Sequence, residues 1–199
     1  MTDTLRLFIA LELPDVLLDA LADVQDRLRA EAPRRAVRWA RTEGIHLTLK
    51  FLGEAPAAQQ AAIGAALREA VQGHAPLTIR AEGLGCFPDT ARPRVIWIGL
   101  AGERRALTAL QRDVEAAMVP LGFPPEKRRF NPHLTLGRVR REAYAADVKA
   151  LGRLIAGTTV GEIGRWTADA VSLMRSELRP DGARYTCLLR VPLAAAGGR

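Results

Sequence analysis

Apolar positions in the first quarter of the chain follow two spacings, one typical of strands and one typical of helices. Residues 5–11 (LRLFIAL) are almost all apolar, which predicts a buried strand. Apolar residues then recur at helical spacing from Leu17 to Leu28, which predicts a helix that ends near Pro33. Residues 46–52 (HLTLKFL) form a short, mainly apolar run and predict the next strand.

The same two spacings continue to the end of the chain. In chain order, the remaining predicted elements are a helix over 56–71, strands over 77–87 and 94–100, a helix from Leu107 until Pro120, a strand over 133–139, a weaker helix over 143–155, and a final hairpin of strands over 167–178 and 183–193. Pro56 is expected near the start of its helix, and residues 179–182 (RPDG) at the turn of the hairpin. Strands and helices therefore alternate, without a linker that would mark a domain boundary.

The composition is that of an ordinary folded protein. The chain has 199 residues, of which 48% are hydrophobic. No stretch approaches the roughly 20 apolar residues that span a bilayer, and acidic residues stand near the N-terminus where a signal peptide would need a basic flank. We therefore expect one domain over residues 1–199 that acts in the cytoplasm, away from membranes.

The two cysteines, Cys86 and Cys187, lie far apart, each inside an apolar strand-like run. Neither belongs to a CxxC motif or to a cluster with metal-ligand spacing. Because free cysteine is among the most buried residue types, both are expected to be buried and reduced.

The tetrapeptide HLTL occurs twice, at 46–49 and 133–136, in a chain with three histidines. Each half of the chain has a strand, a helix and one such strand, so the repeat indicates a duplicated unit with one motif in each of two intertwined lobes. If a pseudo-two-fold axis relates the halves, the two motifs meet across a cleft.

Alternation of side chains along a strand separates the residues of each motif. His46 and Thr48 are expected on one face, and the leucines together with Phe51 on the other. His133 and Thr135 are expected to share a face in the same way. Each strand would then pack its leucines and present a polar pair.

Two imidazoles and two hydroxyls suit a displacement at phosphorus. Imidazole gains and loses a proton near neutrality, so one histidine can take a proton from water while the other gives one to the leaving oxygen. Threonine hydroxyls can donate hydrogen bonds to the non-bridging phosphate oxygens, without a metal. The third histidine, His74, has neither a threonine two residues later nor a strand around it, and is expected to be structural.

The net charge of +7 arises from 29 basic and 22 acidic residues, and the basic ones are nearly all arginine. Two basic clusters lie just upstream of the two histidine strands and favour an anionic ligand such as RNA. The candidate RNA contacts in these clusters are Arg34, Arg35, Lys127, Arg128 and Arg129. The alternative is that arginine simply covers ordinary solvated surface, because charge alone does not define a site.

The paired H-x-T motifs stand within longer stretches that resemble one family. These stretches are RLFIAL, VRWARTEGIHLTLKFLG, RPRVIWIGL, FNPHLTLGRVR and LMRSELRPDGARYT, and they cover residues from about 5 to 190. The family is that of the RNA 2′,3′-cyclic phosphodiesterases, also called 2′–5′ RNA ligases, in the 2H phosphoesterase superfamily. The resemblance implies a two-lobed α+β fold, in which antiparallel sheets form a central cleft and helices pack outside.

The resemblance also implies the activity and the substrate. The expected reaction is metal-independent hydrolysis of a terminal 2′,3′-cyclic phosphate to a 2′-phosphate, on RNA ends or nucleotides, with weak and reversible 2′–5′ joining of RNA. No cofactor and no metal are expected, and the protein is expected to act as a monomer. A hydrolase of internal 2′–5′ linkages would use the same residues and stays open. A non-catalytic RNA-binding protein could dispense with both motifs, so their presence argues against it.

Roles of single residues follow from the same resemblance. It implies His46 as general acid, His133 as general base, and Thr48 and Thr135 as ligands of the phosphate. Arg138 matches a family position for a further phosphate contact, although strict alternation places it on the leucine face unless Gly137 allows a bulge. The aromatic residues nearest the motifs in sequence are each either core or a platform for a base: Phe8, Trp39, Phe51 and Phe130.

Overall fold

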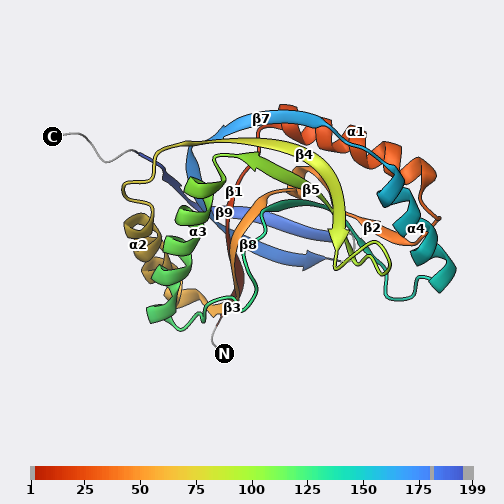
Figure 1. The fold of residues 1–199 in the computed structure, drawn as a ribbon. Helices are drawn as coiled ribbons and strands as arrows, with labels where there is room; N and C mark the ends of the chain where they lie inside the picture. The colour runs from red at the N-terminus through yellow and green to blue at the C-terminus, as the bar shows by residue number, and fades with distance from the viewer. Residues whose placement is uncertain (1–2, 180–181, 195–199) are drawn as a thin grey trace.

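Two antiparallel sheets with helices on their outer sides make up the structure (Figure 1). It is a computed structural model that describes residues 3–179 and 182–194. Sheet A has the strand order β3-β1-β8-β9, and sheet B has the order β2-β6-β5-β4-β7. The strands are β1 (Thr4–Leu11), β2 (Val37–Trp39), β3 (Leu47–Pro56), β4 (Leu77–Phe87), β5 (Val95–Gly102), β6 (His133–Val139), β7 (Glu162–Ala168), β8 (Ala170–Arg179) and β9 (Gly182–Pro192). The expected α+β class is confirmed.

Two of the four helices in the described residues, α1 (Asp15–Glu31) and α3 (Arg104–Met118), contact the sheet opposite to the one whose strand precedes them. The other two are α2 (Gln60–Ala70) and α4 (Ala145–Gly157). α1 follows a strand of sheet A but contacts β7 of sheet B, whereas α3 follows a strand of sheet B and contacts β3 of sheet A. α2 packs beside α3, and α4 contacts β4. Because α1 and α3 each pack against the sheet opposite to their preceding strand, one hydrophobic cluster contains residues from both sheets.

The apolar faces predicted for the helices are the faces that the structure buries. In α1 the buried leucines run from Leu17 to Leu28, and in α3 the buried face begins at Leu107 and ends at Met118. Burial of such a stripe supplies most of the stability of an amphipathic helix. Within the described ranges, no helix is long and apolar enough to cross a membrane.

Two predicted boundaries are wrong because pairing within the sheets overrides local signals. Strand β3 continues to Pro56, which pairs with Thr4, and a short 3₁₀ turn then precedes α2. The strand predicted over 167–178 is mainly β8, whereas its first two residues, Thr167 and Ala168, end β7, a strand of sheet B that was not predicted. The three-residue strand β2 was not predicted. Pairing of β8 with β9 confirms the final hairpin, whereas residues 180 and 181 of its turn lie outside the described residues.

The prediction that both cysteines are buried is wrong for one of them. Cys86 is buried, whereas Cys187 is exposed. Cys187 lies on β9, the edge strand of sheet A, and its partner across the ladder is Met174, which in turn pairs with Phe8. This is the face of sheet A that does not belong to the main core, because Phe8, Ala10 and Met174 form a separate small cluster.

Candidate active site

The two histidine strands, β3 and β6, share the same irregularity. In β3, Lys50 pairs with Ile9 and Thr48 pairs with Ala10, so that Leu49 has no residue opposite it. In β6, the pairs of β5 with Thr135 and Gly137 leave Leu136 without a partner in the same way. Each strand thus has a β-bulge three residues after its histidine. The duplication therefore extends to the local backbone.

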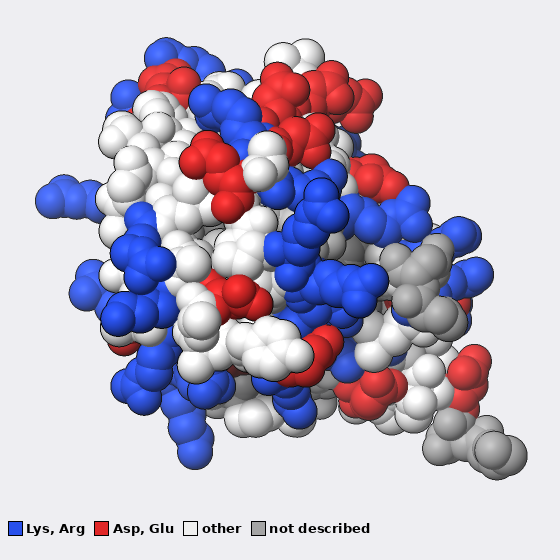
Figure 2. All heavy atoms as spheres, turned by 90° about the vertical axis from the view of Figure 1, so that its right-hand side faces the viewer, with Lys and Arg blue, Asp and Glu red and all other residues white. Residues whose placement is uncertain are grey.

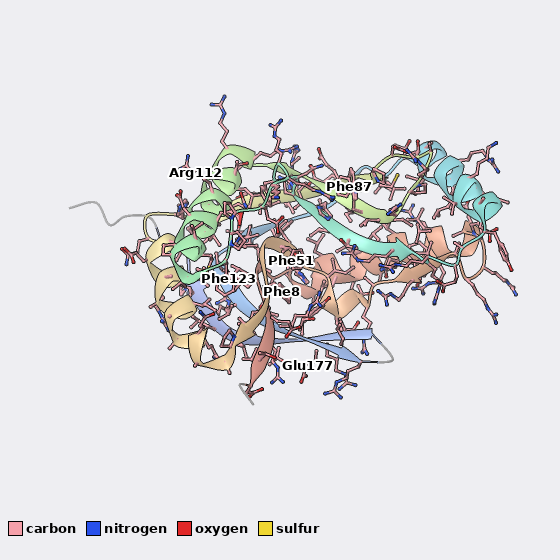
Figure 3. The ribbon with its side chains drawn as sticks, turned by 90° about the horizontal axis from the view of Figure 1, so that it is seen from below. Phe8, Phe51, Phe87, Arg112, Phe123 and Glu177 are labelled. Carbon is pink, nitrogen blue, oxygen red and sulfur yellow. The ribbon has the colours of Figure 1, made fainter. Side chains whose placement is uncertain are left out.

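The bulge resets the alternation of side chains and changes what lies beside the histidines. Phe51, predicted on the leucine face, instead is 56% exposed, and its ring centroid lies 6.2 Å from that of Phe8. Figure 3 shows both rings on the side of sheet A that faces sheet B. The corresponding bulge in β6 places Arg138 on the face of His133 and Thr135, as the resemblance requires. The prediction for Phe51 is wrong because it assumed an unbroken strand.

The residue that follows each bulge residue differs between the two strands. Lys50 is only 2% exposed, and its ammonium group pairs with Glu115 of α3 and donates to the carbonyl oxygen of Pro124 at 2.9 Å. The equivalent position in β6 is Gly137, where a Cβ would lie 2.8 Å from a methyl group of Val37. In β3 this position therefore holds a lysine in a buried ion pair. In β6 the same position has no room for a side chain.

A buried glutamine supports each bulge. Nε2 of Gln111, in α3, donates to the carbonyl oxygen of Leu49 at 3.3 Å. Nε2 of Gln25, in α1, donates to that of Leu136 at 2.7 Å. Both glutamines are buried, and they come from α1 and α3, the two helices that contact the sheet opposite to the strand that precedes them. These two helices thus support the face on which the candidate residues lie.

Both histidines are oriented by the same hydrogen bond. Nδ1 of His46 lies 2.8 Å from the carbonyl oxygen of Gly44, and Nδ1 of His133 lies 2.8 Å from that of Asn131. A carbonyl oxygen only accepts, so each Nδ1 carries a proton and donates it. The other ring nitrogen, Nε2, is then the one that gains and loses a proton.

Aromatic rings hold the imidazoles in place. Phe8 stacks on His46 with centroids 4.5 Å apart, and Tyr185 meets the same imidazole edge-on at 5.1 Å. In sheet B, Phe87 meets His133 edge-on at 5.0 Å, and Trp97 lies 6.4 Å away. Phe87, Trp97 and Tyr185 were not among the predicted candidates, because they lie far from both motifs along the chain.

The indole of Trp97 needs a glycine beside it. Gly85 is opposite Trp97 in the β4–β5 ladder, and a Cβ at this position would come within 2.2 Å of the indole ring. The ring therefore lies over backbone that has no side chain. This arrangement keeps the indole flat on sheet B beside His133.

The electrostatic surroundings of the two imidazoles differ. Burial lowers the pKa of His46, while its hydrogen bond to Gly44 and the carboxylate of Glu12 oppose this shift. Burial also lowers the pKa of His133; the hydrogen bond to Asn131 opposes this shift, but the guanidinium of Arg138 adds to it. Burial is the main cause at both imidazoles, and the nearby charges differ in sign: Glu12 favours the protonated form of His46, and Arg138 favours the neutral form of His133.

The basic clusters predicted to contact RNA lie on exposed connections. Arg34 and Arg35 stand in the turn between α1 and β2, where Arg35 has a left-handed φ of 65°. Lys127, Arg128 and Arg129 are exposed in the segment between α3 and β6, and Arg128 lines a hollow of about 410 Å³ beside α3. No described contact joins these five residues to His46 or His133.

The other predicted aromatic residues and the third histidine belong to the framework. Trp39 is half-buried with the guanidinium of Arg29 5.7 Å above its ring, and Phe130 is half-buried against the main core. Nε2 of His74 lies 2.9 Å from a carboxylate oxygen of Asp113 in α3, which is consistent with its expected structural role.

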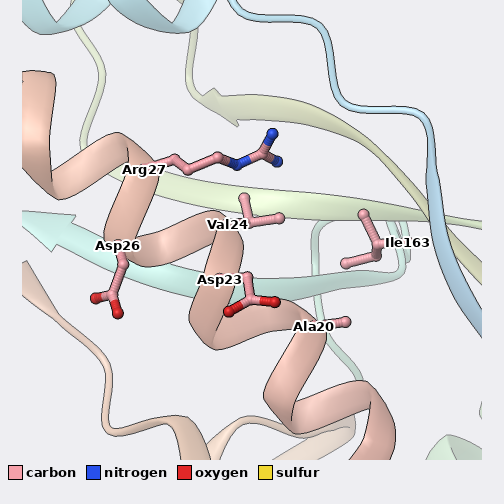
Figure 4. Close-up of a pocket in the computed structure, with 6 residues that line it drawn as sticks. All are labelled: Ala20, Asp23, Val24, Asp26, Arg27 and Ile163. Carbon is pink, nitrogen blue, oxygen red and sulfur yellow. The ribbon is translucent and has the colours of Figure 1, made fainter.

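Other hollows and acidic groups lie away from the histidines. A hollow of about 640 Å³ lies between α1 and β7, on the helix side of sheet B, and is lined by Asp23, Asp26 and Arg27 among others (Figure 4). Among the described residues, no group of three or more His, Cys, Asp or Glu side chains could hold a metal ion.

Comparison with known proteins gives one consistent family. The family model "LigT like Phosphoesterase" matches twice in succession, over residues 11–97 and 98–185. Among curated proteins, the chain is similar to the RNA 2′,3′-cyclic phosphodiesterase of Methanothermobacter thermautotrophicus, with 34% identity over 91% of this chain and 95% of the relative. It is also similar to the protein of that name from Aquifex aeolicus, with 31% identity over 84% of this chain and 88% of the relative.

Solved structures agree with this result. A protein of Thermus thermophilus is 29% identical, with a TM-score of 0.77 over 96% of this chain and 98% of the other. The E. coli LigT structure complexed with 3′-AMP has a TM-score of 0.75 over 96% of this chain and 99% of the other, at 24% identity, and supports the fold. The two successive family matches each contain one H-x-T strand, in agreement with the predicted duplication.

Proposed function

Because the chain belongs to the LigT-like phosphoesterase family, we propose that it hydrolyses terminal 2′,3′-cyclic phosphates of RNA to 2′-phosphates. The observation that carries this proposal is the pair of equivalent strands, each with a histidine held through Nδ1 and a threonine two residues later on the same face. Two such groups supply the base and the acid that the displacement needs.

In the proposed mechanism, one water molecule replaces O3′ at phosphorus. Nε2 of His133 takes a proton from the water as its oxygen bonds to phosphorus, and the P–O3′ bond breaks. Nε2 of His46 gives its proton to O3′, which becomes a hydroxyl, so the product is a 2′-phosphate with a free 3′-OH. Hydroxyl groups of Thr48 and Thr135 donate hydrogen bonds to the non-bridging oxygens, where charge builds up. A proton then passes from His133 to His46 through solvent.

The charges near the two imidazoles support this assignment of roles. A general acid must hold its proton until the leaving oxygen needs it, and Glu12 favours the protonated form of His46. A general base must be neutral when water arrives, and Arg138 favours the neutral form of His133. The reverse assignment would place each charge against the required state.

The same displacement can use an RNA hydroxyl in place of water. Attack by a 5′-OH, with O3′ again leaving, forms a 2′–5′ linkage. We propose this joining as a weaker second activity of the same four residues. We also propose that Arg34, Arg35, Lys127, Arg128 and Arg129 contact phosphates of the RNA further from the reacting end.

Substrate and metal dependence test the proposed function. Purified protein should convert nucleoside 2′,3′-cyclic phosphates, and RNA that ends in one, to 2′-phosphates in the presence of EDTA. The products are identified by chromatography against 2′- and 3′-phosphate standards. A 3′-phosphate product would mean that O2′ leaves instead. Activity lost in EDTA and restored by a divalent ion would contradict proton transfer by the two histidines.

The pH dependence of kcat/KM should show the effect of the Glu12 carboxylate on the pKa of His46. Since burial lowers both histidine pKa values, the acid limb, set by His133, should lie below the usual histidine value of about 6.5. The alkaline limb is set by loss of the proton from His46. Glu12→Gln removes a charge that raises the pKa of His46, so this limb should move to lower pH.

An acidic residue elsewhere on the surface provides the control for this profile. Glu31→Gln, at the exposed end of α1, should leave both limbs where they are in the wild type. If Glu12→Gln moved the acid limb instead, His46 would be the base and the proposed roles would be reversed.

A further inference from the structure

Two arginines meet side by side on the face of sheet B that carries His133. Strand β2 pairs with β6 without a register shift, and Arg38 stands directly opposite Arg138. Residues directly opposite one another in an antiparallel pair project from the same face. Both side chains are exposed, and within residues 3–179 and 182–194 neither forms an ion pair with an acid. Arg38 belongs to the first basic cluster, residues 34–41, but was not named among the candidate RNA contacts.

The fold gives no reason for this pair of like charges. Val37 and Trp39, on either side of Arg38, supply the contacts of β2 with the core. Like charges directly opposite in a sheet are unfavourable, so the pair costs stability unless an anion lies between or beside the guanidinium groups. Figure 2 shows many basic side chains, with acidic ones among them, on the side of the molecule that carries α4 and the end of β2. Guanidinium groups suit phosphate oxygens because their planar fork can donate two hydrogen bonds at once.

The order of the strands gives the two arginines different positions relative to the reacting phosphate. The bulge at Leu136 turns Arg138 toward the face of His133, and its charge already acts on that imidazole. Arg38 lies one strand further out, about 4.8 Å from β6, on the side away from β5. Arg38 is thus displaced from His133 both along β6 and across the sheet, so an anion bound at Arg38 is a group separate from the phosphate at the histidines.

We infer that Arg38, beside Arg138, forms a second anion subsite that binds the 5′-phosphate of the terminal nucleotide. This inference rests on the proposed function. A 2′,3′-cyclic phosphate occupies both ribose hydroxyls of the last nucleotide, so the next phosphate of the substrate is the one on its O5′. In RNA this group is the diester that joins the preceding nucleotide, and in a mononucleotide it is a free monoester. Both present non-bridging oxygens of the same chemistry to the guanidinium groups.

Three substrates that differ only at O5′ test the subsite. They are a nucleoside 2′,3′-cyclic phosphate, the same compound with a 5′-phosphate, and a dinucleotide that ends in the cyclic phosphate. For the wild type we expect kcat/KM to be about tenfold higher for the two compounds with a phosphate at O5′, mainly through KM, since charge-assisted contacts at an exposed site are modest. Arg38→Gln should remove this advantage and leave the first compound within about twofold of wild type. Arg38→Lys should keep part of it.

A matched control is available on α4. Arg153 is also an exposed arginine, and Arg153→Gln should keep the full advantage of the O5′ phosphate. Thermal melting of each variant shows whether the fold is intact.

The other possible outcomes distinguish failure of the Arg38 subsite from failure of the proposed hydrolysis. If the wild type hydrolyses all three substrates equally well, the inference is wrong and the proposed function stands. Equal losses of Arg38→Gln on all three would place Arg38 at the reacting phosphate or in the fold, and would overturn the subsite. An advantage that only the free monoester confers would exclude the RNA diester as its occupant. If the wild type hydrolyses none of the three, the proposed function itself fails.

Discussion

Replacement of His46 or His133 by alanine should lower kcat on a nucleoside 2′,3′-cyclic phosphate by about 10²–10⁴-fold, with the fold intact. In the proposed mechanism each imidazole moves a proton that the threonine beside it on the same face, Thr48 or Thr135, cannot carry, because a hydroxyl does not titrate near neutrality. The protein contains its own control for this experiment. His74→Ala removes a histidine that pairs with Asp113 beside the helices, and should keep turnover close to that of wild type.

The two histidines should also act as a unit. An activated water is of little use if the leaving oxygen receives no proton, so the double variant should be scarcely worse than the poorer single variant. Rates are measured under saturating substrate, and circular dichroism and melting temperature report the fold. A folded single variant with nearly wild-type turnover would remove that histidine from the mechanism, and strictly additive losses would mean that the residues act in separate steps.

Replacement of Lys50 by methionine should lower the free energy of unfolding by about 3–5 kcal/mol, because it leaves the carboxylate of Glu115 without its partner in a largely buried position. The variant also removes the donor to the carbonyl oxygen of Pro124. Chemical denaturation, with the midpoint and the slope both fitted, measures the loss.

A second substitution separates loss of charge balance from loss of packing. Lys50→Met together with Glu115→Gln removes both charges, and should recover a large part of the lost stability. A single Lys50→Met variant within about 1 kcal/mol of wild type would show that Glu115 finds solvent or another partner, and that the pair does not anchor the bulge of β3 to α3.

Local sequence patterns were sufficient for much of the fold. Strands β4 and β6 have the bounds predicted from their apolar runs, and the buried faces of α1 and α3 are those given by helical spacing. The repeated tetrapeptide indicated the duplication, and the alternation rule placed His46 with Thr48 and His133 with Thr135. These features depend on residues within a few positions of one another, so the local sequence is sufficient to predict them.

The tertiary structure decided which other groups lie beside the histidines. The position of Phe51 and Arg138 depends on bulges, which alternation does not anticipate because a bulge exists only relative to the partner strand. Each bulge is supported by a glutamine from a helix that follows a strand of the opposite sheet. Tyr185 reaches His46 from a strand near the other end of the chain, and Arg38 meets Arg138 only because β2 joins sheet B. The sequence by itself therefore determined the repeated histidine and threonine pairs, whereas long-range strand pairing and the packing of α1 and α3 against the opposite sheets decided the charges and aromatic rings around them.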